Sequence, residues 1–221
     1  MSLTKRLVNK PGGRGAGKGA ADGTRQRLRV AAQTEFAKRG FAGASVDRIA
    51  ATARVNKAMI YYHFSSKAAL YREILRDMFQ AVGRRALAAA ESNQPPAEKI
   101  GLFVHAISAE AEARPHFPPI WLREVAEGGT HLDAAVLKDM TSVVRSLATI
   151  IEDGVRLGRF TPVSPFLVHA GIVAPLMLHF GSRDLRARLE RSGLRGAGEV
   201  EPALLVEHLR RVALGLLEGR T

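Results

Sequence analysis

The residues best suited to contact another molecule lie in one short stretch, ARVNKAMIYYHFSSKAALY. Tyr61, Tyr62 and His63 stand in a row, with Lys57 before them and Lys67 after them. A single short helix cannot bury all of these rings, so part of the cluster must face outward. Ammonium, phenol and imidazole groups donate to phosphate oxygens, and lysine also reaches guanine edges in the major groove. This chemistry predicts a surface that binds nucleic acid.

The positive charge of the chain is concentrated in its first part. The formal net charge is +12, and residues 1–90 contain 18 Lys/Arg against 5 Asp/Glu. Residues 91–221 contain 15 against 16, so the whole excess belongs to the first part. Such an asymmetry is the electrostatic footprint of a protein that binds a polyanion. An acidic membrane surface would explain the charge equally well, so composition alone leaves both partners open.

Composition also limits the class of protein. The chain has 221 residues, is 46% hydrophobic and contains no cysteine, which allows one large or two smaller domains with a proper core. The lack of cysteine excludes a disulfide framework and a thiolate zinc site. No apolar run approaches the ~18 residues of a membrane helix, and the N-terminus lacks the apolar centre of a secretory signal. We therefore expect a soluble, cytoplasmic protein with no membrane partner.

The first 22 residues differ from the rest of the chain. Residues 1–22 are rich in Gly, Lys and Arg and lack apolar periodicity, which predicts a disordered basic arm. A solvated tail and an arm that follows the minor groove or the phosphates are both consistent with it. The run GGRGAGKG, from Gly12 to Gly19, nearly matches a phosphate-binding loop. Its last position lacks the required hydroxyl and no apolar strand precedes it, so we expect no nucleotide site.

The elements that position the cluster are predicted to be helices. Apolar residues recur at helical spacing from Leu28 to Phe36, and Gly40 closes this first helix. Ser45 is a suitable N-cap for a second helix that ends near Ala53.

Two further helices follow in the same part of the chain. Asn56 can cap a third, very short helix in which Ile60 and Phe64 share the buried face. A fourth and longer helix is predicted to begin at Ser65 or Ser66. The result is a pair of helices joined by a tight turn, followed by a long helix.

Two helices joined by a tight turn, the second short and polar on one face, form a helix-turn-helix. Its second helix lies in the major groove of DNA while the first crosses the backbone. With Ile60 and Phe64 packed inward, the opposite face carries lysine and tyrosine, and helix N-termini favour nearby phosphates. The residues expected to contact DNA are Ser45, Arg48, Asn56, Lys57, Ala58, Met59, Tyr61, Tyr62, His63 and Lys67.

Residues 31–75 resemble the DNA-binding domain of the tetracycline-repressor (TetR) family, whose pattern is F…GF…S/T…IA…AGVSKGTLYYHFKSKEEL. The resemblance implies a three-helix helix-turn-helix domain over 23–70 and a helical ligand-binding and dimerisation bundle over 71–221. It also implies a homodimeric regulator, a repressor that a small-molecule effector releases from double-stranded operator DNA. The matching positions are Phe36, Gly40, Phe41, Ser45, Ile49, Ala50, Val55, Lys57, Tyr61, Tyr62, His63, Phe64, Ser66, Lys67 and Leu70.

Three positions depart from the family pattern. Arg54 replaces the usual turn glycine, which predicts a side chain in the left-handed backbone region. Ala58 and Met59 replace a common Gly-Thr pair and remove a hydroxyl that could meet DNA. The base preference of relatives therefore does not carry over.

The second part of the chain also shows only helical periodicity, so we expect an all-α protein. Helices are predicted near 96–113, 116–127, 132–157, 164–181 and 202–218. The last two have wide apolar faces, which favours a four-helix interface with a second subunit over complete burial in one bundle. An apolar effector cavity, with plain core packing as the alternative, is assigned to Phe103, His105, Phe117, Trp121, Met140, His169 and Met177.

Enzyme and metal chemistry find little support in the sequence. No pair has the i, i+4 spacing of a helical metal motif among the histidines of the second part, so we expect no metal and no cofactor; the histidines considered are His105, His116, His131, His169 and His179. A helical enzyme would need a catalytic motif, and no Ser/His/Asp order or HExxH is present. Four acidic residues are interpreted as solvated: Glu110, Glu112, Glu124 and Glu127.

Overall fold

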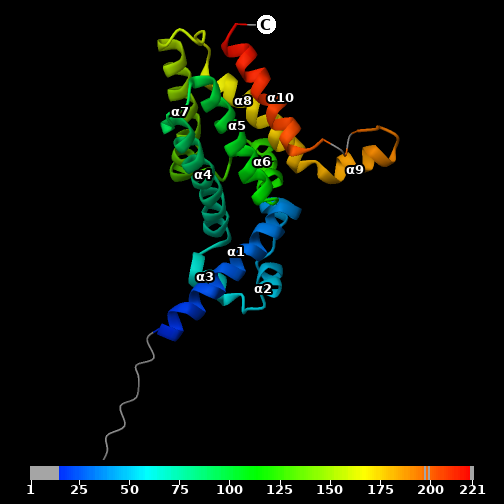
Figure 1. Cartoon of the computed structure of the whole chain (residues 1–221). Helices are drawn as coiled ribbons and strands as arrows, with labels where there is room; N and C mark the ends of the chain where they lie inside the picture. The colour runs from blue at the N-terminus through cyan, green and yellow to red at the C-terminus, as the bar shows by residue number, and fades with distance from the viewer. Residues whose placement is uncertain (1–14, 197, 199, 220–221) are drawn as a thin grey trace, which may run out of the picture.

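The computed structural model describes residues 15–196, 198 and 200–219, with side chains described from residue 21 onward. These residues form ten α-helices and no strand, which confirms the expected all-α class (Figure 1). The helices are α1 (Gly15–Gly43), α2 (Val46–Ala53), α3 (Ala58–Phe64), α4 (Lys67–Glu91), α5 (Pro96–Ala113), α6 (Phe117–Ala126), α7 (Ala134–Arg156), α8 (Pro165–Gly181), α9 (Arg183–Arg191) and α10 (Pro202–Leu217).

The basic arm was expected over residues 1–22, and residues 1–14 of it lie outside the described residues. Helix α1 already begins at Gly15, so residues 15–22 are helical and the expectation of disorder is wrong for them. Adding residues to an existing helix costs little once the first turns are formed. The packed part of α1, around Leu28 and Phe36, provides that helix.

Helices α1 to α3 form a unit at one end of the molecule, and α4 leads from it into the rest of the chain (Figure 1). The predicted apolar face of α1 is buried, because Leu28 and Phe36 are fully inaccessible and pack with Ile49 and Ile60. Helix α1 breaks at Gly40, where φ is +69°, a conformation that glycine adopts without steric cost. Helices α1 to α3 and the start of α4 share this core, and the exposed side of α3 faces away from it.

The remaining helices pack around α4 and α5. Helix α4 lies against both α5 and α7, while α6 packs on α8 and α10 packs on α5 and α8. Ile74 and Met78 on α4 are fully buried, as are Ile100 and Phe103 on α5. Helix α4 therefore belongs to the cores of both parts of the molecule.

The five helices predicted in the second part all exist, with ends within two residues of the expected ones. Helix α9 was not predicted. None of its residues is buried, and Leu185 and Leu189 are its exposed apolar positions. Leu185 and Leu189 are four residues apart, so helical spacing is present, but only these two large apolar residues carry it in a segment dominated by arginine. Figure 1 shows α9 extending away from the bundle.

A membrane span is not evident in the described residues. No single helix there combines the length and apolar content that crossing a bilayer requires. Helices α8 and α9 meet that requirement only as a pair, and the two are bent by 65° relative to each other.

Candidate nucleic-acid interface and interior cavity

A left-handed residue makes the turn between α2 and α3. Arg54 has φ 55° and ψ 48°, which confirms the conformation predicted for this position. The Val55 N–H donates to the Ala50 carbonyl oxygen at 3.0 Å and closes the end of α2. The Asn56 side chain accepts a hydrogen bond from the Ala58 N–H at 2.8 Å, so Asn56 caps α3 as predicted. These local bonds set the direction in which α3 leaves α2.

The exposed side of α3 carries the predicted lysine and tyrosines. Tyr61 is 53% exposed and Tyr62 is 76% exposed, while Ile60 beneath them is inaccessible. Lys57 lies on the same side with 61% of its side chain exposed, and its Nζ is 3.1 Å from an exposed Asp47 carboxylate oxygen. Such exposed ion pairs contribute little to stability, so Lys57 can exchange Asp47 for a phosphate. The outward orientation is confirmed, and contact with DNA stays a prediction.

Two other residues of the recognition helix are less accessible. Met59 is partly buried and packs against the core. His63 is half-buried, its ring meets that of Tyr62 edge-on at 4.9 Å, and its buried Nε2 has no hydrogen-bond partner in the described residues. In this conformation that nitrogen does not reach a phosphate.

Lys67 has a structural role that the sequence did not indicate. Its Nζ donates to the carbonyl oxygens of Phe41 and Ala44, at 2.9 and 3.1 Å, and lies 4.4 Å from the centre of the Phe41 ring. These carbonyl groups lie at the C-terminal end of α1, where a cation is favourable. Two of the three ammonium donors of Lys67 are thus used within the protein, and its contact with phosphate stays a prediction.

Arg48 and Ser45 are also held by neighbouring groups. The Arg48 Nε is 2.6 Å from Glu35 Oε1, and its Nη2 donates to the Gly43 carbonyl oxygen. Ser45 occupies the N-cap position of α2 as predicted, but its hydroxyl makes no cap hydrogen bond, and its N–H donates to Glu35. Burial opposes ionisation of Glu35, but the bonds from Arg48 and Ser45 hold its pKa below the usual range. The start of α2 is ordered by Glu35 instead of by the serine side chain.

A further exposed cation lies at this surface, and we predict that it contacts DNA. Arg54 is exposed at the turn beside α3. Its replacement of the usual glycine was the available signal, because a turn that needs glycine rarely accepts a long basic side chain without another use.

A cavity of about 340 Å³, called the interior cavity below, lies among α4, α5, α6, α7 and α8, and the exposed Val125 and Phe166 at its edge leave it partly open to solvent. Five of the predicted effector residues line it: Phe117, Trp121, Met140, His169 and Met177. Burial lowers the pKa of His169 to about 4, which leaves its imidazole neutral at pH 7. The cavity therefore has an uncharged lining.

Two predicted effector residues do not line the cavity. Phe103 is fully buried behind His169, with the two ring centres 6.4 Å apart. His105 is exposed on the outside of α5. It is two residues from both Phe103 and the cavity-lining Ile107, which places it on the opposite side of the helix.

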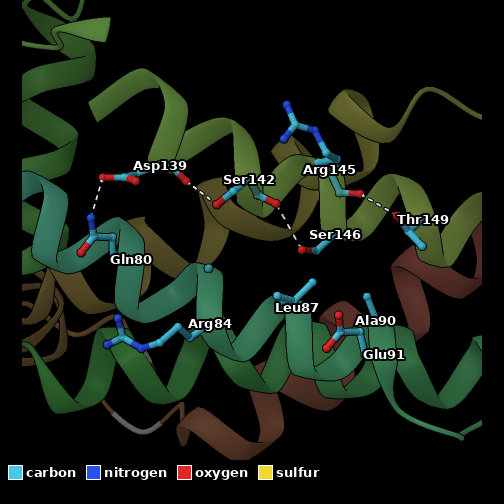
Figure 2. Close-up of a pocket in the computed structure, with 11 residues that line it drawn as sticks. Gln80, Arg84, Leu87, Ala90, Glu91, Asp139, Ser142, Arg145, Ser146 and Thr149 are labelled. Atoms are coloured by element: carbon cyan, nitrogen blue, oxygen red, sulfur yellow. Dashed lines mark hydrogen bonds between the residues drawn. The ribbon is translucent and has the colours of Figure 1, made fainter. Parts of the chain in front are cut away.

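A second recess, of about 550 Å³, lies on the outside between α4 and α7 (Figure 2). The hydroxyl groups of Ser142, Ser146 and Thr149 line it, but each donates to a carbonyl oxygen of its own helix. Gln80 donates to Asp139 across the recess. Because these polar groups are already paired, the recess shows no prepared ligand site.

A buried carboxylate joins the two parts of the molecule. Glu124 is 0% exposed and accepts hydrogen bonds from the Tyr71 hydroxyl at 2.9 Å and the His131 N–H at 2.8 Å. The His131 ring packs on Phe41, 4.1 Å between centres, at the end of α1. Burial and the neighbouring Glu124 carboxylate raise the pKa of Tyr71, which keeps its hydroxyl protonated as the donor. This cluster was missed by the sequence analysis.

The interpretation of the acidic residues as solvated is wrong at two positions. Glu124 is buried in the cluster just described, and Glu110 is buried and paired with Arg85 and Arg114. Buried carboxylates need such partners. Tyr71 and Arg85 are distant in sequence and leave no local signal, whereas Arg114 follows Glu110 at the helical i, i+4 spacing. Glu124 lies near Glu127 and His131 in a group of metal-ligand type, but its oxygens already accept bonds from Tyr71 and His131. We therefore assign no metal to it.

Comparison with known proteins agrees with the helix-turn-helix geometry. The profile of "Bacterial regulatory proteins, tetR family" matches residues 28–74. The HTH-type transcriptional repressor SCO4008 of Streptomyces coelicolor is 46% identical over 54 residues, which are 24% of this chain and 28% of that repressor. The HTH-type transcriptional regulator YhgD of Bacillus subtilis is 29% identical over 145 residues, covering 65% of this chain and 75% of the relative.

A solved structure extends the likeness to the whole fold. A tetR-family regulatory protein from Rhodococcus RHA1 aligns with a TM-score of 0.71, covering 88% of this chain and 96% of that protein at 18% identity. At this identity the likeness shows a shared fold, while the sequence matches assign the DNA-binding segment. The DNA-binding segment, residues 28–74, belongs to the TetR family of bacterial transcriptional regulators, and the chain as a whole shares the fold of a tetR-family protein.

Proposed function

We propose that the protein is a homodimeric repressor that binds a near-palindromic operator and is released by a small molecule in the interior cavity. The observation that carries the proposal is the exposed side of α3, where Lys57, Tyr61 and Tyr62 stand over a buried Ile60. These groups suit phosphate and base-edge contacts in a major groove. The protein acts on DNA in the cytoplasm.

Selection of bound sequences from randomised DNA tests this proposal and supplies the operator. Two recognition helices of a symmetric dimer would select two inverted half-sites about 34–36 Å apart, or a multiple of that spacing. Recovery of such a motif supports the proposal. Recovery of no sequence preference contradicts it.

The dimer is proposed to form through α8 and α10. On α8, Leu167, Gly171 and Leu178 lie on one exposed face. On α10, Leu204 and Val212 are exposed. Large exposed apolar patches indicate an interaction surface, and the pairing of two helices from each subunit gives a four-helix interface.

Helix α6 is proposed to couple the cavity to the DNA-binding unit. Trp121 and Val125 of α6 line the cavity. Glu124 of the same helix is bonded to Tyr71 of α4, and the Arg123 side chain donates to the Lys38 carbonyl oxygen of α1 at 3.2 Å. A ligand that displaces α6 would therefore move α1 and α4. Effector and operator then weaken each other's binding, ordinarily by about 1–3 kcal/mol.

A further inference from the structure

The interior cavity has a lining that limits what can bind there. None of its lining residues is Lys, Arg, Asp or Glu. The only polar side chains in the lining are His169 and the indole of Trp121. Transfer of an ion from water into such surroundings is costly unless an opposite charge or several hydrogen bonds replace the lost water.

His169 is the lining side chain that can both donate and accept a hydrogen bond, because the indole of Trp121 is a donor only. It has no hydrogen-bond partner in the described part of the chain, and it lines the cavity from α8. Its imidazole is neutral, because burial lowers its pKa to about 4. A neutral imidazole has one donor and one acceptor nitrogen, so it can pair with a hydroxyl or a carbonyl group but cannot neutralise an anion.

We propose that the effector is an uncharged, mainly apolar molecule that places one hydroxyl or carbonyl group against His169. The regulatory role of this molecule rests on the proposed function. Its binding in the cavity does not depend on that function. The cavity volume of about 340 Å³ suits one small molecule of this kind. The inference names the chemistry that the lining recognises.

Charged ligands are the alternatives that the lining disfavours. A carboxylate or phosphate would find no cation in the cavity. An ammonium group would find no carboxylate, and the rings of Phe79, Phe117 and Trp121 would supply only cation–π attraction. Arginine residues occur instead at the outer recess, which Arg84 of α4 and Arg145 of α7 help to line.

The sole tryptophan of the chain reports directly on the cavity. Trp121 lines it, so ligand entry changes the only indole fluorescence of the protein. We would titrate the full chain at pH 7.5, without DNA and below micelle concentrations, with decanol, decanoate and decyltrimethylammonium. The three probes share one alkyl chain and differ in the charge of the head group.

We expect saturable binding of decanol, and binding of decanoate and of the ammonium at least about tenfold weaker, because neither ion finds a partner. Equal or tighter binding of either ion overturns the inference, as does absence of decanol binding. This comparison uses the unaltered chain, so it does not depend on the folding of a variant. It also uses no DNA, so its failure is separate from a failure to bind an operator.

A substitution tests the directed contact. H169F keeps a flat ring and removes the hydrogen bond, so decanol should bind about tenfold more weakly. The matched control is H105F, because His105 is exposed on the outside of α5. Equal decanol affinity of H169F and H105F would show that His169 does not hold the hydroxyl and would overturn that part of the inference.

Discussion

Two lysines in the helix-turn-helix show how differently similar residues can be used. Lys57 is exposed and shares only an ion pair with an exposed aspartate. Lys67 is half-buried and donates to two carbonyl oxygens at the end of α1. Both lysines were predicted to contact DNA. Their spacing in the sequence does not show which of them donates to carbonyl groups of the protein itself.

The substitution K67M should therefore act on stability. It removes two hydrogen bonds from buried or half-buried carbonyl groups, and we expect a loss of about 1–3 kcal/mol in the free energy of unfolding. Urea denaturation measures this loss. K57M serves as the control and should change the free energy of unfolding by less than about 0.5 kcal/mol. Equal stability of K67M and the unaltered protein would contradict the structural role.

Arg54 supplies a second test at the residue scale. Its left-handed backbone costs a side-chain-bearing residue about 1–2 kcal/mol, whereas glycine adopts it freely. After the greater entropy of glycine in the unfolded chain is subtracted, R54G should stabilise the protein by up to about 1 kcal/mol. T52G, in the last turn of α2, should instead destabilise it by about 0.3–0.5 kcal/mol. If R54G loses as much stability as T52G, the left-handed backbone at Arg54 is not strained.

At the scale of elements, apolar periodicity was the reliable signal. It located α5 to α8 and α10 because each buries a stripe of large side chains. It failed for α9, which buries nothing, and it could not show which residues of α5 face the cavity. Nor could it show that Glu124 is buried, because its partners Tyr71 and His131 come from other segments. Contacts between distant segments follow from the packing of helices, which a local pattern does not contain.

The outer faces of α8 and α10 allow the dimer to be tested at this scale. A Cβ added at Gly171 meets no atom within 4 Å, so G171E fits the single subunit. In a four-helix interface the same carboxylate would be buried without a partner. We expect G171E to be monomeric in sedimentation at concentrations where the unaltered protein is a dimer.

The control for this test is G23E. Gly23 also lies on a helix with no atom within 4 Å of an added Cβ, but it belongs to α1. G23E should remain a dimer. If G171E and G23E have the same mass in solution as the unaltered protein, α8 does not form the interface.

At the scale of the whole molecule, the basic first part of the sequence and the nearly neutral second part occupy different regions of the structure. The helix-turn-helix lies at one end, and α4 connects it to the bundle that contains the cavity (Figure 1). The charge asymmetry of the sequence therefore corresponds to a spatial division between the end with the helix-turn-helix and the end with the cavity. The contacts of α4 and α6 with both ends could not be predicted from the sequence, because they join distant segments.

The central claim is that the exposed side of α3 binds the operator, and titration of the selected operator at several salt concentrations tests it most directly. The double variant K57A/Y61A should bind at least about tenfold more weakly, with a salt slope shallower by about one phosphate contact. K138A, which removes an exposed lysine from α7, should match the unaltered protein. Unchanged affinity and salt slope in K57A/Y61A would contradict the account.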